Sequence, residues 1–171
     1  MPSRIFPGRM TRPDWNNLDC QNRNALPRHA YLVQFPDQAS CEAALDNNRR
    51  YLSPSVMLLN GTWDFKLFES ITQLPENIFA YRSGFESMTV PAAYDVGKQL
   101  HRRPVPLRSW PFAVNPPLIP EDIPVGVFHR SIQFNPDWTS LRKRLVLQGV
   151  LSAYHVVVNG RIAGYAQQGL L

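Results

Sequence analysis

The side chains that could do acid–base or metal chemistry are thinly spread in this sequence. It has thirteen aspartates and glutamates, four histidines and two cysteines. Cleaving a glycosidic bond takes two carboxyl groups that face each other across it, and a metal site takes clustered ligands. Only Glu121 and Asp122 are neighbouring acids, and adjacent side chains in a proline-rich loop point apart into solvent. The acids therefore indicate neither a catalytic pair nor a metal site.

The histidines are equally isolated. His129 and His155 fall in β-rich runs, where an ordinary strand position is a commoner role than that of a catalytic base, and His29 and His101 have no partner nearby in the sequence. No serine or cysteine has the strand–turn–helix context of a hydrolase nucleophile. The residues alone predict no catalytic, cofactor-binding or metal-ligating residue in this chain.

The positive charge of the chain raises the question of nucleic-acid binding. The net charge is +5 and the pI is about 9.6, but the arginines are dispersed, with short clusters only at Arg102–Arg103 and Arg142–Arg144. No phosphate-binding glycine loop, zinc spacing or aromatic–basic RNA motif is present. We expect a solvated basic surface and no specific nucleic-acid partner.

Length and composition indicate one domain. The chain has 171 residues, 44% of them hydrophobic, which suits a single domain with a core. Its apolar runs are far shorter than the ~20 residues of a membrane span, and its start lacks the apolar stretch of a signal peptide. Cys20 and Cys41 are too few for a secreted disulfide scaffold. We expect a cytoplasmic protein that is not inserted in a membrane.

An irregular arm precedes the periodic part of the sequence. The first 36 residues are rich in proline, arginine and asparagine and show no period that would bury a face. Asp37 can cap a short helix that runs through Asn48. We therefore expect an arm over residues 1–36 and a folded domain over residues 37–171.

From Leu58 onward the signals are those of β-structure. In the stretch Leu59–Phe68, aromatic and aliphatic residues alternate with polar ones, the period of a half-buried strand. Further β-rich runs are predicted over Gly126–Phe134, Arg144–Val150 and Ala153–Val158. Pro104–Pro124 contains seven prolines and is excluded from helix and central strand.

The sharpest local prediction is a hairpin near the C-terminus. Asn159 and Gly160 separate two β-rich runs, and both residues tolerate the positive φ of a type I′ turn. Val156–Val158 and Ile162–Tyr165 should then be antiparallel neighbours. The expected fold is an all-β sandwich of the jelly-roll type, with one short helix and the irregular arm. Its predicted buried residues are Trp63, Phe65, Phe134 and Val156.

Five stretches, in this order along the chain, resemble the N-terminal region of the large β-galactosidases of glycoside hydrolase family 2. Together they cover nearly the whole chain from Asp14 onward, and the stretch Met10–Asn17 resembles the beginning of that family's sequences. The five are NRNALPRHAY at 22–31, LNGTWDFKLF at 59–68, MTVPAAYD at 88–95, WPFAVNPPLIP at 110–120 and LQGVLSAYHVVVNGRIAGYAQ at 147–167.

The resemblance implies a jelly-roll, galactose-binding-like domain that precedes immunoglobulin-like domains and a catalytic barrel. The family's catalytic glutamates lie in that barrel, beyond Leu171. The family enzymes use magnesium and sodium, and none of those ligands maps onto this chain. Three family features also differ. The Tyr-Thr/Ser-Asn loop of the galactose site corresponds to His101–Trp110, which has no asparagine. The Asn-Pro-Thr-Gly motif has become Ile123–Gly126, and the aspartate of Phe-Asp-Gly-Val has become Gln148.

About six strands are predicted, against ~8 in a complete jelly roll. We therefore expect a front portion of a larger glycosidase, cut within its first domain. Alone it should be inactive toward β-galactosides and poorly stable, because strands without partners leave sticky edges.

Two other functions stay open. A stand-alone carbohydrate-binding module could use Trp110, Phe112 and Trp138 as a sugar platform, although these aromatics could equally pack the loop against the sandwich. An interaction fragment could instead dock on a partner chain, or on the remainder of the enzyme, that supplies the missing strands.

Overall fold

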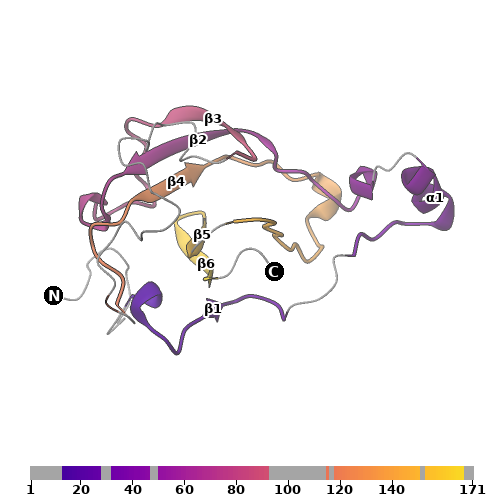
Figure 1. Cartoon of the computed structure of the whole chain (residues 1–171). Helices are drawn as coiled ribbons and strands as arrows, with labels where there is room; N and C mark the ends of the chain where they lie inside the picture. The colour runs from indigo at the N-terminus through magenta and orange to yellow at the C-terminus, as the bar shows by residue number, and fades with distance from the viewer. Residues whose placement is uncertain are drawn as a thin grey trace.

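The all-β prediction is confirmed by the computed structural model, in which two three-stranded antiparallel sheets form an incomplete sandwich (Figure 1). One short α-helix and a few turns of 3-10 helix accompany the sheets. The structure describes residues 13–27, 32–46, 50–92, 115, 118–150 and 153–167.

The first sheet has the strand order β3-β2-β4. Its strands are β2 (Gly61–Phe68), β3 (Glu86–Val90) and β4 (Val125–His129), and β2 is antiparallel to both neighbours. Phe65 is 1% exposed, as the alternation predicted. Trp63 is only half-buried, because it lies near the beginning of β2, where its indole Nε1 donates to Leu59 O at 2.7 Å.

The second sheet has the order β1-β6-β5 and contains the predicted hairpin. Strand β5 (Tyr154–Val158) returns as β6 (Arg161–Ala166) through Asn159 and Gly160, whose φ angles are 49° and 76°. The antiparallel pairing is therefore confirmed. Val156 is half-buried rather than buried. It lies beside a register shift on β5, and β5 is the edge strand of its sheet.

The arm takes part in this sheet instead of remaining irregular. Strand β1 (Asn22–Arg23) pairs with β6, and the side-chain amide of Asn24 donates to Ala163 O at 2.7 Å. A 3-10 turn, η1 (Asp14–Asn16), precedes β1. Period-based reasoning missed β1 because a two-residue strand is too short to show alternation.

One predicted strand, Gly126–Phe134, forms over its first part only, and a second prediction was wrong. Strand β4 ends at His129, and Phe134 is 50% exposed. The predicted strand Arg144–Val150 lies in the described part of the chain but is not a strand. Within the described residues no strand pairs with it, and Leu145–Leu147 are exposed. A β-rich run becomes a strand only where a neighbour accepts its backbone hydrogen bonds.

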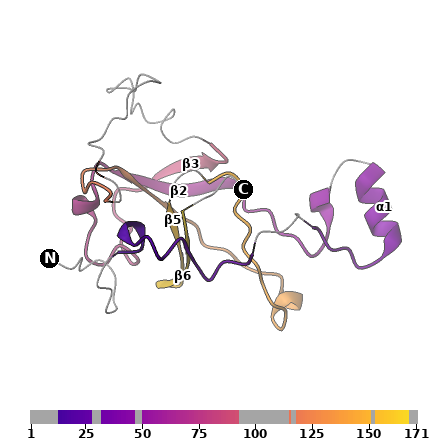
Figure 2. The same ribbon diagram turned by 60° about the horizontal axis from the view of Figure 1, so that its bottom comes forward.

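Helix α1 covers Gln38–Asp46, and Asp37 caps it as predicted: Ser40 N donates to Asp37 Oδ1 at 2.8 Å. The predicted end at Asn48 lies outside the described residues. Helix α1 stands apart from both sheets (Figures 1 and 2). It neighbours the 3-10 turn η2 (Arg50–Leu52). Most of the proline-rich stretch lies outside the described residues, and residues 119–124 within it form neither helix nor strand.

The core is small, and its largest buried side chains are Phe65 on β2 and Tyr165 on β6. The ring of Phe65 contacts that of Phe128 on β4, with centroids 4.7 Å apart. Large apolar side chains elsewhere are exposed, including Val158 on β5 at 53%. The buried hydrophobic residues in the described ranges are Ala44, Phe65, Phe68, Ile78 and Tyr165.

Candidate functional site

Asp14 is a buried acid within the described part of the chain, and three polar side chains gather around its carboxylate. Its side chain is 2% exposed, although it belongs to the short turn η1 near the start of the chain. A buried carboxylate is costly unless charge and hydrogen bonds compensate it. Both of its oxygens are therefore expected to have partners.

The first oxygen is bound by groups from the arm itself. Arg23 Nη2 on β1 donates to Asp14 Oδ1 at 2.7 Å, and the Cys20 thiol lies 3.6 Å from the same oxygen. The guanidinium of Arg23 is half exposed, so this ion pair connects the buried carboxylate to solvent.

The second oxygen is bound from the far end of the sequence. His155 Nε2 on β5 lies 3.2 Å from Asp14 Oδ2 and donates to it in the neutral ring form that carries hydrogen on Nε2. Two aromatic rings enclose the imidazole. The ring of Tyr165 on β6 lies 4.5 Å away, and Trp15 meets the imidazole edge-on at 5.9 Å.

Burial and charge oppose each other in this cluster. Burial on its own would raise the pKa of Asp14, but the hydrogen bonds and charge supplied by Arg23 and His155 together keep that pKa below its ordinary value. Burial lowers the pKa of His155 and outweighs the opposing effect of Asp14. Burial, with the nearby Asp14 charge, raises the pKa of the Cys20 thiol. The cluster is thus a carboxylate, a guanidinium, a neutral imidazole and a protonated thiol.

This arrangement is built to hold segments together. Both carboxylate oxygens of Asp14 and the Nε2 of His155 already take part in hydrogen bonds. A raised pKa leaves the Cys20 thiol a poor nucleophile. The hydroxyl of Tyr165 is buried without a hydrogen-bond partner of ordinary geometry in the described residues, and burial raises its pKa. The chemistry of the cluster is that of a structural ion pair.

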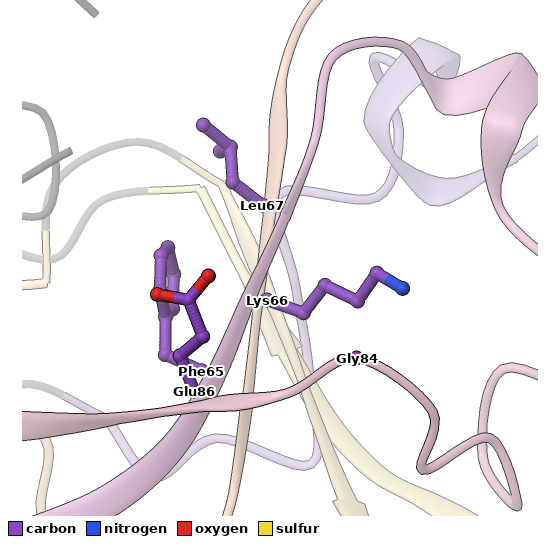
Figure 3. A pocket seen from close by; sticks show the side chains of 5 residues that line it. All are labelled: Phe65, Lys66, Leu67, Gly84 and Glu86. Atoms are coloured by element: carbon purple, nitrogen blue, oxygen red, sulfur yellow. The ribbon is translucent and has the colours of Figure 1, made fainter. Parts of the chain in front are cut away.

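A pocket of about 280 Å³ opens at the point where β3 leaves β2 (Figure 3). Figure 3 shows Lys66 pointing away from Phe65 and Glu86. The Lys66 ammonium is already bound, donating to Tyr81 Oη at 2.9 Å and to Ser83 O at 2.8 Å. The volume is slightly below the range of about 300–1,000 Å³ for small-molecule sites. Because Lys66 points away and its ammonium is already bound, the pocket offers a ligand no converging set of polar groups.

The adjacent acids and the strand histidine considered from the sequence lie in ordinary surroundings. Glu121 and Asp122 are both exposed in a turn. His129 on β4 is paired with the exposed carboxylate of Asp64 on β2, with 3.2 Å between Nδ1 and Oδ2. His129 and His155 are both strand residues, as predicted.

Of the three aromatics of the possible sugar platform, the structure describes Trp138. Trp138 is half-buried, and its ring lies 6.3 Å from that of Phe134. Lys143 Nζ sits 5.6 Å from the centroid of the Phe134 ring and donates to Trp138 O at 2.5 Å. This favours the packing role for Trp138. Trp110 and Phe112, the other two aromatics of the platform, lie outside the described residues, as do the isolated histidines His29 and His101.

The metals implied by the family resemblance find no fitting ligand set here. Within the described ranges, no group of three or more His, Cys, Asp or Glu side chains is placed to hold an ion. Gln148, which replaces the family's aspartate, is exposed on an extended segment. We therefore derive no step through magnesium or sodium in this chain.

Sequence reasoning missed the roles of Asp14, Arg23 and His155. Two of the resembling stretches contain Arg23 and His155, and Asp14 belongs to the stretch that resembles the family's beginning. Their places in three separate stretches, far apart in the chain, gave no sign in the sequence that they meet. Local periodicity carries no information about it.

The fold and the cluster together define a β-sandwich domain whose buried charges fasten its N-terminal arm to a hairpin. In the described part of the chain, no helix is long and apolar enough to span a bilayer.

The family comparison agrees with this architecture. Residues 56–171 match the model of "Glycosyl hydrolases family 2, sugar binding domain". The chain therefore belongs to family 2 of the glycosyl hydrolases, through that family's sugar binding domain.

Individual relatives are β-galactosidases. The chain is 31% identical over 171 residues to the β-galactosidase of Pseudoalteromonas haloplanktis, 33% over 162 residues to that of Psychromonas ingrahamii, and 32% over 168 residues to that of Oenococcus oeni. These alignments cover 92–95% of this chain but 15% of each relative. The chain thus spans about a seventh of the length of these relatives.

Proposed function

We propose that this chain is the N-terminal, sugar-binding-domain portion of a β-galactosidase, an enzyme that hydrolyses terminal β-D-galactosides such as lactose. The observation that carries the proposal is the family match over residues 56–171, together with relatives that are named β-galactosidases. In this proposal residues 1–36 are an arm and residues 37–171 are the domain, with the arm docked through β1.

The role proposed for the chain is structural. A retaining glycosidase needs an acid/base and a nucleophile with carboxyl groups ~5–5.5 Å apart. Asp14 is tied to Arg23 and His155, and Asp64 is paired with His129. The resemblance assigns both catalytic groups to a separate barrel domain. The two cysteines, Cys20 and Cys41, are free, which supports a reducing, cytoplasmic location.

The partner in this proposal is the remainder of the enzyme or another subunit. Leu145 and Val146 are at least half exposed, and so is Val158 on the edge strand β5. Uncovered apolar side chains beside an open strand edge suit the addition of further strands.

The test is reconstitution of activity. The chain is purified from a host without β-galactosidase and mixed with a relative's enzyme from which the equivalent region has been deleted. Turnover of a chromogenic β-galactoside should be absent for each piece alone and present in the mixture. Turnover by the chain alone contradicts the structural role, and a silent mixture contradicts the proposed partner.

A stand-alone carbohydrate-binding module is the second candidate. Its support is the aromatic pair Phe134 and Trp138, which lies on a surface turn. Retention of the purified chain on immobilised galactosides, lost in Trp138→Ala and kept in Trp63→Phe, would favour it over the docking role.

A further inference from the structure

We infer that Asp14, Arg23 and His155 form an acid-releasable latch that holds the N-terminal arm on the β5–β6 hairpin. The part of the arm that carries the latch is residues 14–24, and 'the arm' refers to these residues below. The latch is a conformational device in the fold and does not depend on which sugar the family enzyme takes.

The contacts between arm and hairpin are few, and the latch is their centre. Strand β1 contributes only two residue pairs with β6, Asn22 with Ala166 and Arg23 with Tyr165. Gln167 N donates to Gln21 O at 3.2 Å, Gln167 Nε2 to Cys20 O at 3.4 Å, and Asn24 Nδ2 to Ala163 O at 2.7 Å. Two pairs of a short strand form a weak attachment. The contact of Asp14 on the arm with His155 on β5 adds to these ties a hydrogen bond whose strength depends on protonation.

The charge balance of the latch makes it sensitive to one proton. Asp14 and Arg23 already neutralise each other at 2.7 Å. A proton on His155 would add a second cation to a group that holds one anion, inside aromatic walls made by Trp15 and Tyr165. The free-energy cost of desolvating that second positive charge would not be compensated, because the cluster holds no second anion. The neutral imidazole is the form that fits.

The titratable and charged side chains around the Asp14 carboxylate come from β1, from the turn before it and from the β5–β6 hairpin. Arg23 is on β1, Cys20 is in the turn between η1 and β1, His155 is on β5 and Tyr165 is on β6. Within the pH range below 7, the thiol, the phenol and the guanidinium keep their protons. His155 and Asp14 are thus the two groups that change.

Both groups act in the same direction. The pKa of His155 is lowered in the folded state, so the chain binds fewer protons when the arm is docked than when it is released. The pKa of Asp14 is also lowered, with the same consequence. Docking therefore weakens as pH falls, first below about 6.5 through His155 and then below about 3.9 through Asp14.

The experiment measures amide hydrogen exchange of the arm in the full chain from about pH 7.5 to about pH 5.0, after correction for intrinsic rates. Arm protection should fall by up to about tenfold per pH unit below pH 6.5, the limit for one proton. The segment of β2 (Gly61–Phe68) serves as internal reference and should keep its protection.

Three variants separate the latch from general instability. In His155→Gln, whose amide can still donate to Asp14, the fall should disappear above about pH 5. In Asp14→Asn, arm protection should already be about tenfold lower at neutral pH, and the fall below about pH 6.5 should remain, because His155 is still desolvated beside Arg23. The control His129→Gln removes a half-buried imidazole that is paired with the exposed Asp64, far from the arm in the sequence, and should behave like the natural chain.

Several results would overturn the latch. They are an unprotected arm at neutral pH, a pH-independent arm, an unchanged fall in His155→Gln, and simultaneous loss of protection in the arm and β2. If a variant does not fold, the natural chain is sufficient for the test: the pH dependence of amide protection in the arm is then compared with that in β2.

Discussion

The aromatic ring of Phe65 rests against the backbone of Gly126, so closely that a β-carbon on this glycine would come within 3.1 Å of Phe65 Cε2. Phe65 is 1% exposed, and its ring also touches Phe128. The ring is thus confined on two sides, and the absence of a side chain at position 126 is what lets it lie over β4.

Gly126→Ala should therefore lower the free energy of unfolding by about 1–3 kcal/mol, the usual cost of overpacking a core. Urea unfolding followed by tryptophan fluorescence measures it. Thr62→Ala, on the exposed face of β2, is the matched control and should change stability by less than about 0.5 kcal/mol. An unchanged midpoint for Gly126→Ala would mean that the ring moves aside.

Arg130 fastens the segment before β2 to the end of β4. Its Nη1 donates to Leu59 O at 2.7 Å and to Asn60 O at 3.0 Å, and the guanidinium lies 5.9 Å from the Trp63 ring centroid. Arg130→Met keeps the aliphatic stem and should cost about 1–2 kcal/mol, because two carbonyls lose a donor. Thermal unfolding measures this cost. Arg161→Met, at an exposed position, is the control and should change the stability little. Equal melts for both variants would contradict the assigned role.

The hairpin turn provides a purely conformational test. Gly160 has a φ of 76°, and a β-carbon there would meet nothing within 4 Å. Gly160→Ala should thus destabilise by about 1 kcal/mol through the left-handed conformation alone. Asn159→Gly, which keeps a residue suited to positive φ, should have a much smaller effect. Larger damage from Asn159→Gly than from Gly160→Ala would show that another turn type forms in solution.

The exposed edge of β5 should make the isolated chain associate with itself. Val158 is 53% exposed, and β5 carries no lysine, arginine or proline that would protect an edge strand. Val158→Lys should shift sedimentation toward the monomer. The same charge added by Thr62→Lys on the central strand β2 should not. If both lysines act equally, net charge rather than the strand edge controls association.

Binding to DNA or RNA should be weak and lost at physiological salt. The triplet Arg142–Arg144 is a compact basic run, but Lys143 is already bound to Trp138 O and Leu141 O. Few phosphate contacts give a shallow dependence of affinity on salt. Fluorescence anisotropy with labelled oligonucleotides checks this, and sequence-selective binding at ~0.2 M salt would refute it.

The features predictable from sequence are those that a few neighbouring residues determine. The Asn159–Gly160 turn and the alternation around Phe65 are local patterns, and both are present in the structure. The segment Arg144–Val150 has equally strong β character but is not a strand. Strand formation there depends on a partner, and no property of the segment itself supplies one.

The candidate site was beyond local patterns for the same reason. Asp14 and His155 are 141 residues apart in the chain. The sequence places Asp14 in a polar arm, where exposure is the usual state of an aspartate. Only the return of β6 beside β1 makes the position buried, so the environment of this acid is a property of the whole topology.

The pairing of β1 with β6 also sets an order of events during synthesis. The arm is made first, but its carboxylate cannot be buried until His155 and Tyr165 have left the ribosome. At about 5–20 residues per second, some 140 residues take roughly 7–28 s to add. Throughout that interval Asp14 and Arg23 remain in water, so the arm is translated well before it can find its place.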